Sequence, residues 1–399
     1  MRLRGRLRPR KKLRGVEERL WRVIQALFRL LGFFLPTSRT AKYCFAGDFE
    51  PGSDARVMFE HVATLDPRPR LIRLSRTQQA PRLEALEEIR ERSLRGAYHA
   101  ATCVVLFTSH EPPRPRRRKP LVVYLWHGMP IKDVANLVSE NRRWRLSRHR
   151  GFAIATSDYF GGIMSRAFGA DATDVAITGL PRNDVLVRRG QSRTASAQFH
   201  GCSRPFVLWL PTWRDDGTSS ALEDWNEAEW DQIDALMRGA ARQLLVKLHP
   251  KDRTGPPEHF RSRTNISIIA HDAWIREGRN LQEALAQSEA LITDISSAAI
   301  DYLVTGRPVG IVTRAIERHR STAVPRALLE AAFQPLSGTP DFARFLSSSA
   351  PPDAALTELL YAAELRDDAA AARVYREVEE RLAVRARRGR LHAAQRRKP

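Results

Sequence analysis

Short runs of apolar residues recur along the chain, and stretches with helical patterning separate them. We predict strands at residues 71–74, 101–107, 121–125, 151–155, 175–178, 206–210, 243–248, 266–269, 290–293 and 308–311. Strands that are apolar throughout are typical of parallel sheets that helices cover on both faces. The pattern stops in the polar stretch 188–204 and then begins again, so we predict an α/β protein with two such sheets in succession.

Helical patterning fills the intervals between these runs. It predicts helices at 57–65, 83–96, 227–240 and 281–287, one that begins near 300, and an Ala-, Glu- and Arg-rich helix over 352–396. Of the 399 residues 43% are hydrophobic, which is enough for two sizeable cores. The three cysteines lie far apart, which excludes a disulfide scaffold and a cysteine-based zinc cluster.

The net charge of +21 is concentrated at the two ends of the chain. Residues 1–14 and 381–398 each contain eight basic residues and no acidic residue, whereas the body between them is close to neutral. A nucleic-acid-binding protein would combine such charge with a recognition fold, and no motif of that kind accompanies these ends. We therefore expect no specific nucleic-acid partner.

The segment from 16 to 35 has the pattern of an amphipathic helix, with one apolar stripe formed by Val16, Leu20, Ile24, Leu27, Leu31 and Phe34. Arginines interrupt its apolar stretch, which excludes a signal peptide. Its runs of consecutive apolar residues are too short to span a bilayer. A basic arm followed by such a helix suits an anionic membrane surface. We predict a membrane-association segment over 1–37; a first helix packed on the core is the alternative.

Polar clusters follow several of the predicted strands, at 126–132, 179–184, 211–216, 247–250 and 293–297. Ligands of open parallel sheets bind beyond the carboxyl ends of the strands, so these clusters are candidate site segments. A His and a Lys at a strand-to-helix turn, with Gly128 between them, suit phosphate chemistry. Ser296 and Ser297 at a helix start form an anion site or a plain N-cap, and the two alternatives stay open.

In combination and in this order, the clusters resemble a known family. The blocks Trp-His-Gly-x-Pro-x-Lys, Pro-Arg-Asn-Asp, Pro-Thr-Trp-Arg-Asp, Lys-Leu-His-Pro and Thr-Asp-x-Ser-Ser, with Asp301-Tyr302 and Gly306-Arg307-Pro308 behind them, resemble the CDP-glycerol glycerophosphotransferase family. This family contains the teichoic-acid primases and polymerases. The resemblance spans about 98–312; the chain departs from the family at Met129, where Thr is usual, and over 313–330.

The resemblance implies a glycosyltransferase-B architecture, in which two Rossmann-like domains enclose a cleft. On this basis we expect an acceptor domain over 38–200, a CDP-donor domain over 201–345, and a C-terminal helical segment with a basic tail over 346–399. It also implies peripheral attachment to the cytoplasmic face of the cell membrane, beside a lipid-linked or polymeric acceptor. Whether the donor is CDP-glycerol or CDP-ribitol, whether one unit or many are added, and whether the product is wall polymer or capsule stay open.

The implied reaction moves a polyol phosphate from the CDP donor to an acceptor hydroxyl and releases CMP. We predict His127 as general base, because a neutral imidazole accepts a hydroxyl proton near pH 7. His249, with Lys247, is predicted to bind or protonate the diphosphate, and Ser296 and Ser297 to hold the donor phosphates. Arg182 and Arg214 supply charge, or else form an interdomain salt bridge with Asp184 or Asp215.

The other predicted substrate-binding residues follow from the same motifs: Gly128, Lys132, Asn183, Asp184, Thr212, Trp213, Pro250, Thr293, Asp294 and Asp301. Asp294 is expected to orient a histidine or to bind donor hydroxyls. No dependable metal cluster occurs in the sequence, so we expect neither a metal nor a cofactor. The alternatives are a sugar-nucleotide-dependent glycosyltransferase on the same fold and a non-catalytic basic adaptor that binds membrane or nucleic acid.

Overall fold

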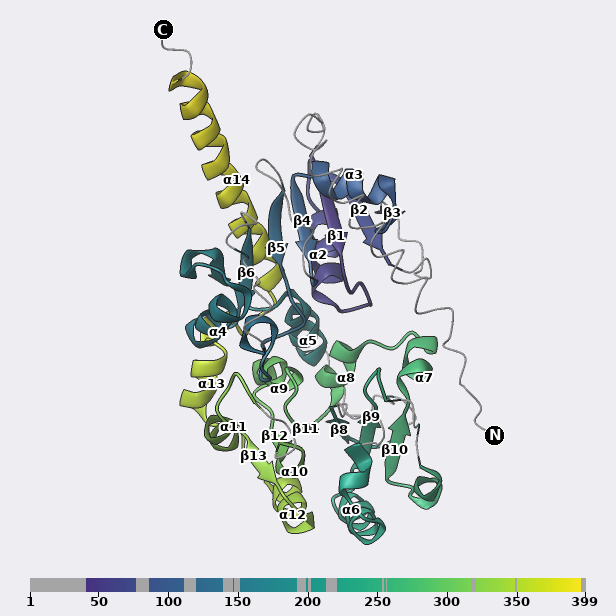
Figure 1. Ribbon diagram of the computed structural model, residues 1–399. Coiled ribbons are helices and arrows are strands. Elements are labelled where there is room, and N and C mark those ends of the chain that lie inside the picture. The colour runs from purple at the N-terminus through teal and green to yellow at the C-terminus, as the bar shows by residue number, and fades with distance from the viewer. Residues whose placement is uncertain are drawn as a thin grey trace, which may run out of the picture.

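The computed structural model describes residues 41–76, 86–110, 120–138, 146, 151–191, 199, 202–212, 221–252, 255, 257–316, 321–348 and 350–395. These residues form two α/β lobes, stacked one above the other in Figure 1. The segment 16–35, predicted to be an amphipathic helix, lies outside the described residues. No helix among the described residues is both long enough and apolar enough to cross a membrane.

The first lobe is built on a seven-stranded sheet in the order β3-β2-β1-β4-β5-β6-β7, in which all neighbours are parallel. Its strands are β1 (Lys42–Ala46), β2 (Arg70–Ser75), β3 (Leu86–Arg90), β4 (Val105–Thr108), β5 (Leu121–Tyr124), β6 (Phe152–Ala155) and β7 (Val175–Ile177). The strands β1 to β3 are added toward one edge of the sheet, and β4 to β7 are added on the other side of β1. The order of strands therefore reverses between β1 and β4. In sheets of this kind, ligands bind at the carboxyl ends of the two strands at this reversal.

The second lobe repeats the arrangement with six parallel strands in the order β10-β9-β8-β11-β12-β13. They are β8 (Phe206–Leu210), β9 (Gln243–Lys247), β10 (Ile266–Ile269), β11 (Ala290–Thr293), β12 (Val309–Val312) and β13 (Gln334–Leu336). Here the reversal lies between β8 and β11. The prediction of two parallel sheets with Rossmann-like topology is confirmed.

Helices cover both sheets and connect the strands (Figure 1). Those of the first lobe are α2 (Asp54–Ala63), α3 (Leu94–Thr102), α4 (Asp158–Phe168) and α5 (Pro181–Gln191). Those that follow are α6 (Glu227–Gly239), α7 (His271–Arg276), α8 (Leu281–Gln287), α9 (Ala298–Tyr302), α10 (Thr313–Ile316), α11 (Arg326–Ala332), α12 (Thr339–Ser347), α13 (Ala354–Leu360) and α14 (Ala370–Gln395).

The predicted helix at 83–96 is wrong. Residues 86–90 form β3 at the edge of the first sheet, and α3 begins only at Leu94, with Ser93 accepting a hydrogen bond from the amide of Gly96. The charged residues that suggested a helix face are satisfied across the sheet instead. Glu87 pairs with Arg70, and Glu88 lies 3.7 Å from Arg73 on the neighbouring strand β2. Charges of opposite sign on adjacent strands favour such an edge.

The two lobes share a hydrophobic core and a C-terminal segment that joins them. One cluster of buried apolar side chains runs through both sheets, and α5 of the first lobe packs against α8 of the second. After the second lobe the chain returns, so that α14 packs on α2, α5 and β5 and then extends beyond the first lobe (Figure 1). The last helix therefore belongs to the packing of the first lobe.

Candidate active site

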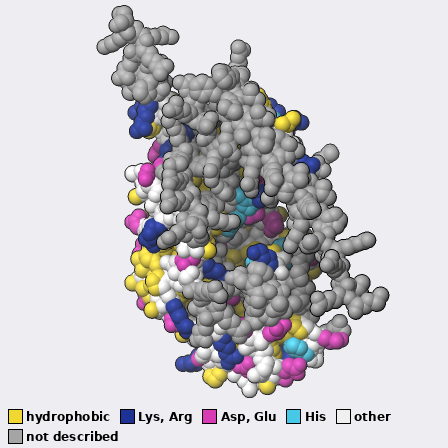
Figure 2. Space-filling view, in the orientation of Figure 1, with side chains coloured by type: hydrophobic (Ala, Val, Ile, Leu, Met, Phe, Trp, Pro, Cys, Tyr) yellow, Lys and Arg dark blue, Asp and Glu magenta, His cyan; other side chains and the backbone are white. Residues whose placement is uncertain are grey.

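Residues from the carboxyl ends of strands in both sheets meet where the lobes face each other. Figure 2 shows histidine, acidic and basic side chains together near the middle of this face of the molecule. The contributing segments follow β1, β4 and β5 in the first lobe and β8, β9 and β11 in the second. They include the two strand pairs at which each sheet reverses its order, where ligand sites of this topology lie.

His127 forms a hydrogen-bonded pair with Asp48. His127 follows β5 and Asp48 follows β1, and the ring Nδ1 lies 2.9 Å from the carboxylate Oδ2. The hydrogen bond from His127 lowers the pKa of Asp48, against the opposing effect of burial. When Nδ1–H is donated to the carboxylate, the lone pair of a neutral ring lies at Nε2. Because the His127 side chain is 40% exposed, a substrate hydroxyl can reach that atom.

A second histidine, His110, stands beside this pair. It follows β4, its Nε2 lies 3.8 Å from the other oxygen of Asp48, and its ring centroid is 5.3 Å from that of His127. Burial, and then the guanidinium of Arg76, lower the pKa of His110. Sequence reasoning missed both Asp48 and His110. The strand-end rule finds them once it is applied to β1 and β4, the pair at which the first sheet reverses.

Asp48, His110 and His127 also offer one ligand atom each within 4.8 Å of one another. Two imidazoles and one carboxylate are a donor set that zinc or non-haem iron accepts. Asp48 and His127 are already hydrogen-bonded to each other, so a metal ion would have to replace the proton between them. The expectation of transfer without a metal stays a prediction.

The backbone around His127 adopts a costly conformation. Trp126 has φ 56°, in the left-handed region, and its ring packs against Phe168 and Tyr124. Such a conformation costs about 1–3 kcal/mol for a residue other than glycine. Gly128 has φ 111°, and a Cβ there would lie 2.0 Å from Nη2 of Arg182 and 2.8 Å from Oγ of Ser297. Glycine is therefore required, because both lobes approach the backbone at this point.

Arg182 lies in the contact between the lobes, and only 13% of its side chain is exposed. Nη1 donates to the carbonyl oxygen of His127 at 2.9 Å, and Nη2 donates to Asp301 of the second lobe at 2.5 Å. Its backbone N–H donates to Asp54 at the start of α2. Of the two roles predicted for Arg182, the structure shows a salt bridge between the lobes, with Asp301 as the partner instead of Asp184 or Asp215; its role toward a substrate stays a prediction.

Basic side chains gather at the end of β9. Nδ1 of His249 accepts a hydrogen bond from the amide of Lys251 at 3.1 Å, which leaves the proton of a neutral ring on Nε2. Burial and the charges of three nearby lysines lower the pKa of His249 to about 4; these are Lys251, Lys247 and Lys132. Burial lowers the pKa of Lys247 to about 8, and its ammonium lies 5.4 Å from the centre of the Trp274 ring. His249 is therefore neutral at pH 7, and Lys247 is mostly charged.

Thr212 and Asp294 meet at the reversal of the second sheet. The amide and the hydroxyl of Thr212 both donate to Oδ2 of Asp294. The second oxygen of Asp294, Oδ1, is buried and has no hydrogen-bond partner among the described residues. Burial raises the pKa of this carboxyl, and the hydrogen bonds from Thr212 and then the charge of Lys132 oppose that effect. Asp294 thus holds the start of the segment after β8 and keeps one further acceptor oxygen, which is buried; its predicted role toward a ligand stays a prediction.

The hydroxyls at the start of α9 have different partners. Ser297 is the N-cap residue of α9 but makes no capping hydrogen bond with its side chain; it donates to the carbonyl of His127 at 3.4 Å. Ser296, one residue earlier, accepts a hydrogen bond from the amide of Ala298. Thr293 donates to the carbonyl of Leu210 on the adjacent strand. The predicted serine pair therefore lies at the contact between the lobes, and one of its hydroxyls touches the His127 segment directly.

Two predicted substrate-binding residues have partners within the protein. Asp184 is 1% exposed and accepts from the amides of Ala370 and Ala371, at the start of α14. Asn183 is equally buried and donates to the Tyr361 hydroxyl. We assign both a structural role, because their polar atoms hold the returning C-terminal segment.

The remaining predicted residues either lie near His249 or fall outside the described part of the chain. Pro250 is exposed at the end of the His249 segment. Lys132 pairs through its backbone with Thr322. Trp213 and Arg214, like Asp215, fall among residues that the structure does not describe, so their predicted roles stay predictions.

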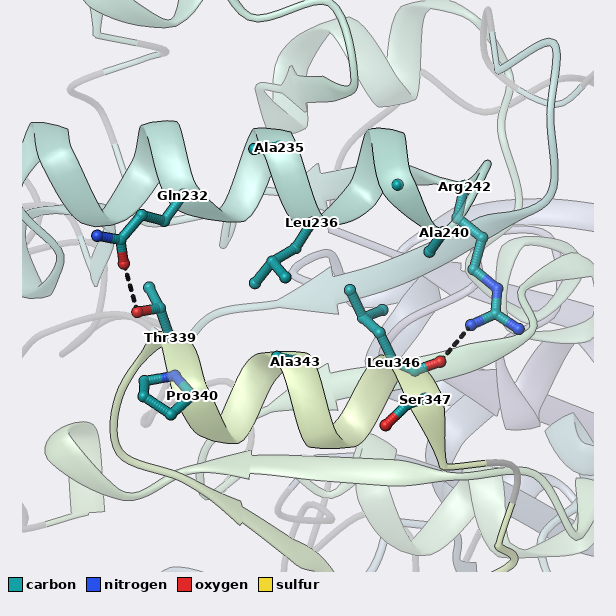
Figure 3. A pocket seen from close by; sticks show the side chains of 11 residues that line it. Gln232, Ala235, Leu236, Ala240, Arg242, Thr339, Pro340, Ala343, Leu346 and Ser347 are labelled. Carbon is teal, nitrogen blue, oxygen red and sulfur yellow. Dashed lines mark hydrogen bonds between the residues drawn. The ribbon is translucent and has the colours of Figure 1, made fainter.

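A groove of about 840 Å³ lies elsewhere, between α6 and α12 of the second lobe (Figure 3). Gln232 and Thr339 bridge it, and Arg242 donates to the carbonyl of Leu346. None of the predicted site residues lines this groove.

Comparison with protein families gives one match that covers most of the chain. The family described as CDP-glycerol:poly(glycerophosphate) glycerophosphotransferase matches residues 33–339.

Three curated relatives illustrate the similarity. A teichoic acid poly(glycerol phosphate) polymerase of Staphylococcus epidermidis is 24% identical over 47% of this chain and 27% of its own length. A teichoic acid glycerol-phosphate transferase of Staphylococcus aureus is 24% identical over 48% and 52%, respectively. A teichoic acid ribitol-phosphate primase of Bacillus spizizenii is 22% identical over 53% and 57%. The chain thus spans between about a quarter and three fifths of these relatives.

Solved structures agree on the fold. The wall teichoic acid polymerase TagF, in a variant soaked with CDPG, superposes with a TM-score of 0.69 at 18% identity, over 94% of this chain and 98% of that chain. A UDP-GlcNAc 2-epimerase from Neisseria meningitidis superposes with a TM-score of 0.50 at 11% identity, over 85% and 99%. At these identities the similarity shows the fold alone, which is of the glycosyltransferase-B type.

Proposed function

The chain belongs to the CDP-glycerol:poly(glycerophosphate) glycerophosphotransferase family, and from this premise we propose that it transfers a polyol phosphate from a CDP-activated donor to an acceptor hydroxyl. The polyol is glycerol or ribitol, and CMP is released. One observation carries the proposal: the segments of the Asp48–His127 pair lie within electrostatic range of the His249 segment, because the charge of Glu50 acts on Lys247 and the charge of Lys132 acts on His249. A base and an anion-binding segment on facing lobes are what transfer between a hydroxyl and a diphosphate needs.

His127 acts as the general base in this mechanism. Its Nε2 takes the proton of the acceptor hydroxyl while the oxygen attacks the phosphorus that carries the polyol. The bond between that phosphorus and the oxygen bridging to CMP breaks, so CMP leaves with the electron pair and the proton stays on His127. Asp48 holds the ring in the tautomer with Nε2 unprotonated and stabilises the imidazolium that forms.

The second lobe stabilises the diphosphate. His249 is neutral at pH 7 and carries its proton on Nε2, so it donates a hydrogen bond instead of transferring a proton. Lys247 supplies a positive charge, and its burial makes the gain on meeting a phosphate larger than in water. The free oxygen of Asp294 accepts from a donor hydroxyl. Ser296 and Ser297 are proposed to lie along the donor phosphates.

The acceptor is proposed to be a lipid-linked or polymeric chain in the synthesis of a teichoic acid or a capsule-like polymer. The relatives named above include a teichoic acid poly(glycerol phosphate) polymerase and a teichoic acid ribitol-phosphate primase, and their names support a teichoic acid as the product. Attachment to the cytoplasmic face of the cell membrane through residues 1–37 would bring the site to such an acceptor.

A donor screen tests the proposal. The full chain is incubated with a soluble acceptor and, separately, with CDP-glycerol, CDP-ribitol, UDP-sugars and CMP-sugars, and the released nucleotide is measured. CMP from one of the CDP-polyols, with the polyol phosphate recovered on the acceptor, is the expected result. Release of UDP or of CMP from a sugar donor alone would instead identify a glycosyltransferase, which is the alternative on this fold.

A further inference from the structure

We propose that Arg182 and Asp301 form a clamp between the lobes that positions the backbone of His127, so that the base is assembled only while the lobes are in contact. This inference rests on the proposed function, because it assigns a role to the base of that reaction. Arg182 is a positioning residue here; it acts through His127 and does not touch the reacting atoms.

The geometry of Arg182 carries the first step. Its guanidinium bridges the His127 carbonyl, at 2.9 Å, and the Asp301 carboxylate, at 2.5 Å. Arg182 and His127 belong to the first lobe, whereas Asp301 lies in α9 of the second lobe. Loss of the contact between lobes would therefore free one end of the guanidinium that holds His127. A planar guanidinium can make two such hydrogen bonds in fixed directions at once, and a lysine ammonium cannot match this geometry.

Burial shows that the clamp is not a surface ion pair. The side chains of Asp54 and Asp301 are each 4% exposed, and Arg182 lies between them. Burial disfavours the charge of Arg182, but the two carboxylates outweigh it and raise its pKa. Removing one partner leaves buried charge uncompensated, so the effect on neighbouring backbone is expected to be large.

The His127 segment needs such an external hold. Trp126 has a left-handed φ of 56°, and Gly128 has a φ of 111° that brings its backbone against Arg182. Glycine adopts a positive φ readily, but a tryptophan keeps such a φ only where its surroundings impose it. The clamp supplies the constraint on one side, and the packing of the Trp126 ring against Phe168 supplies it on the other.

The same carbonyl also meets the proposed donor site. Ser297, at the start of α9, donates to the carbonyl oxygen of His127 at 3.4 Å. The carbonyl therefore accepts from one side chain of each lobe. A donor bound along Ser296 and Ser297 would favour the closed arrangement of the lobes and, through it, the position of the base.

The test uses two variants of the full chain, Arg182→Lys and Asp301→Asn, and one control, Arg242→Lys. Arg242 is a matched arginine, because it too bridges a carboxylate, Glu289, and a backbone carbonyl, that of Leu346, but within the second lobe and away from the site. Hydrogen–deuterium exchange of residues 126–132 is measured first. We expect exchange of this segment to speed up by about tenfold or more in both test variants, and to be unchanged in the control.

Steady-state kinetics with the CDP-polyol follow. We expect kcat to fall by about 10- to 100-fold in the test variants while both KM values change less than about threefold, because a displaced base slows chemistry more than binding. The double variant Asp48→Asn/Arg182→Lys should lose less than the product of the single losses, because both residues act through His127. A purely structural arginine would give independent losses.

Each outcome separates the two proposals. Unchanged exchange of 126–132 in both test variants overturns the clamp, whatever their activity. Faster exchange with wild-type kcat also overturns it, because the position of the segment would then not matter to the base. If the test variants exchange faster but the wild-type protein releases no CMP from any CDP-polyol, the clamp is supported as a contact between the lobes and the proposed function is refuted. If Arg182→Lys unfolds, the isosteric Asp301→Asn decides.

Discussion

Replacing Asp48 with Asn tests the proposed base most directly, because it removes one charge and almost no volume. The carboxylate Oδ2 lies 2.9 Å from Nδ1 of His127 and faces the imidazolium that forms as the acceptor loses its proton. The amide can also donate to Nδ1, and this would place the ring proton on Nε2, where it blocks the base. Both effects raise the barrier of the chemical step and leave substrate contacts intact.

The expected loss of kcat depends on how strongly solvent screens the charges of Asp48 and His127. Two unit charges about 4 Å apart interact by about 4 kcal/mol at an effective dielectric constant of about 20, and by about 1 kcal/mol in water. The Asp48 side chain is 56% exposed and that of His127 is 40% exposed, so the value lies between these limits. A loss of about 2 kcal/mol corresponds to about a 30-fold lower kcat. This value covers the lost charge alone. The blocked tautomer adds to the loss, and in a catalytic triad the same substitution lowers kcat by about 10⁴-fold for that reason.

The assay is CMP release from the CDP-polyol at saturating donor and soluble acceptor, with thermal unfolding as the control for folding. Asp174→Asn is a matched substitution, because Asp174 is also a partly exposed carboxylate, paired with Arg381 far from the site. It should leave kcat unchanged. Near-normal kcat in Asp48→Asn, with His127→Ala inactive, would refute the role of Asp48 and leave His127 as an unassisted base.

Three further predictions concern other parts of the chain. Asp184→Ala should lower the free energy of unfolding, measured by urea denaturation, by about 1–3 kcal/mol, because the amides at the start of α14 lose a buried acceptor. An unchanged stability together with a raised donor KM would instead support the predicted substrate-binding role. The pKa of Lys247 is lowered to about 8, so its ammonium loses a proton as the pH rises through that value, and the donor KM of the wild type should rise above about pH 8. Lys247→Arg stays charged and should abolish this rise, whereas a parallel rise of the donor KM in both proteins would assign the effect to another group. Deletion of residues 1–35 should abolish sedimentation with vesicles that contain anionic lipid and lower activity on a membrane-embedded acceptor much more than on a soluble one; binding of the truncated protein as before would move the anchor to the basic C-terminal end.

The amino-acid sequence by itself determined the class of fold and the segments that carry the chemistry. Runs such as 206–210 are apolar throughout because helices cover both faces of the sheet, and the strand at Phe206–Leu210 begins and ends as predicted. His127, Lys247 and His249 lie at strand ends, where the motifs indicated. This information is local, since it depends on a few consecutive residues and on the periodicity around them.

The tertiary structure decided which of these segments meet. Asp48 is an unremarkable residue of the sequence, and only the placement of β1 beside β4 and near β5 brings it to His127. Residues 86–90 have the charge pattern of a helix but pair as an edge strand, because Arg70 and Arg73 on β2 neutralise them. Arg182 was expected to meet a substrate or Asp184, and it meets Asp301 of the other lobe instead. Such contacts depend on the order of strands in a sheet and on the packing of two lobes. No local sequence pattern encodes the strand order or the packing, because the residues in contact are far apart in the chain. Burial of the whole hydrophobic core determines which of them meet.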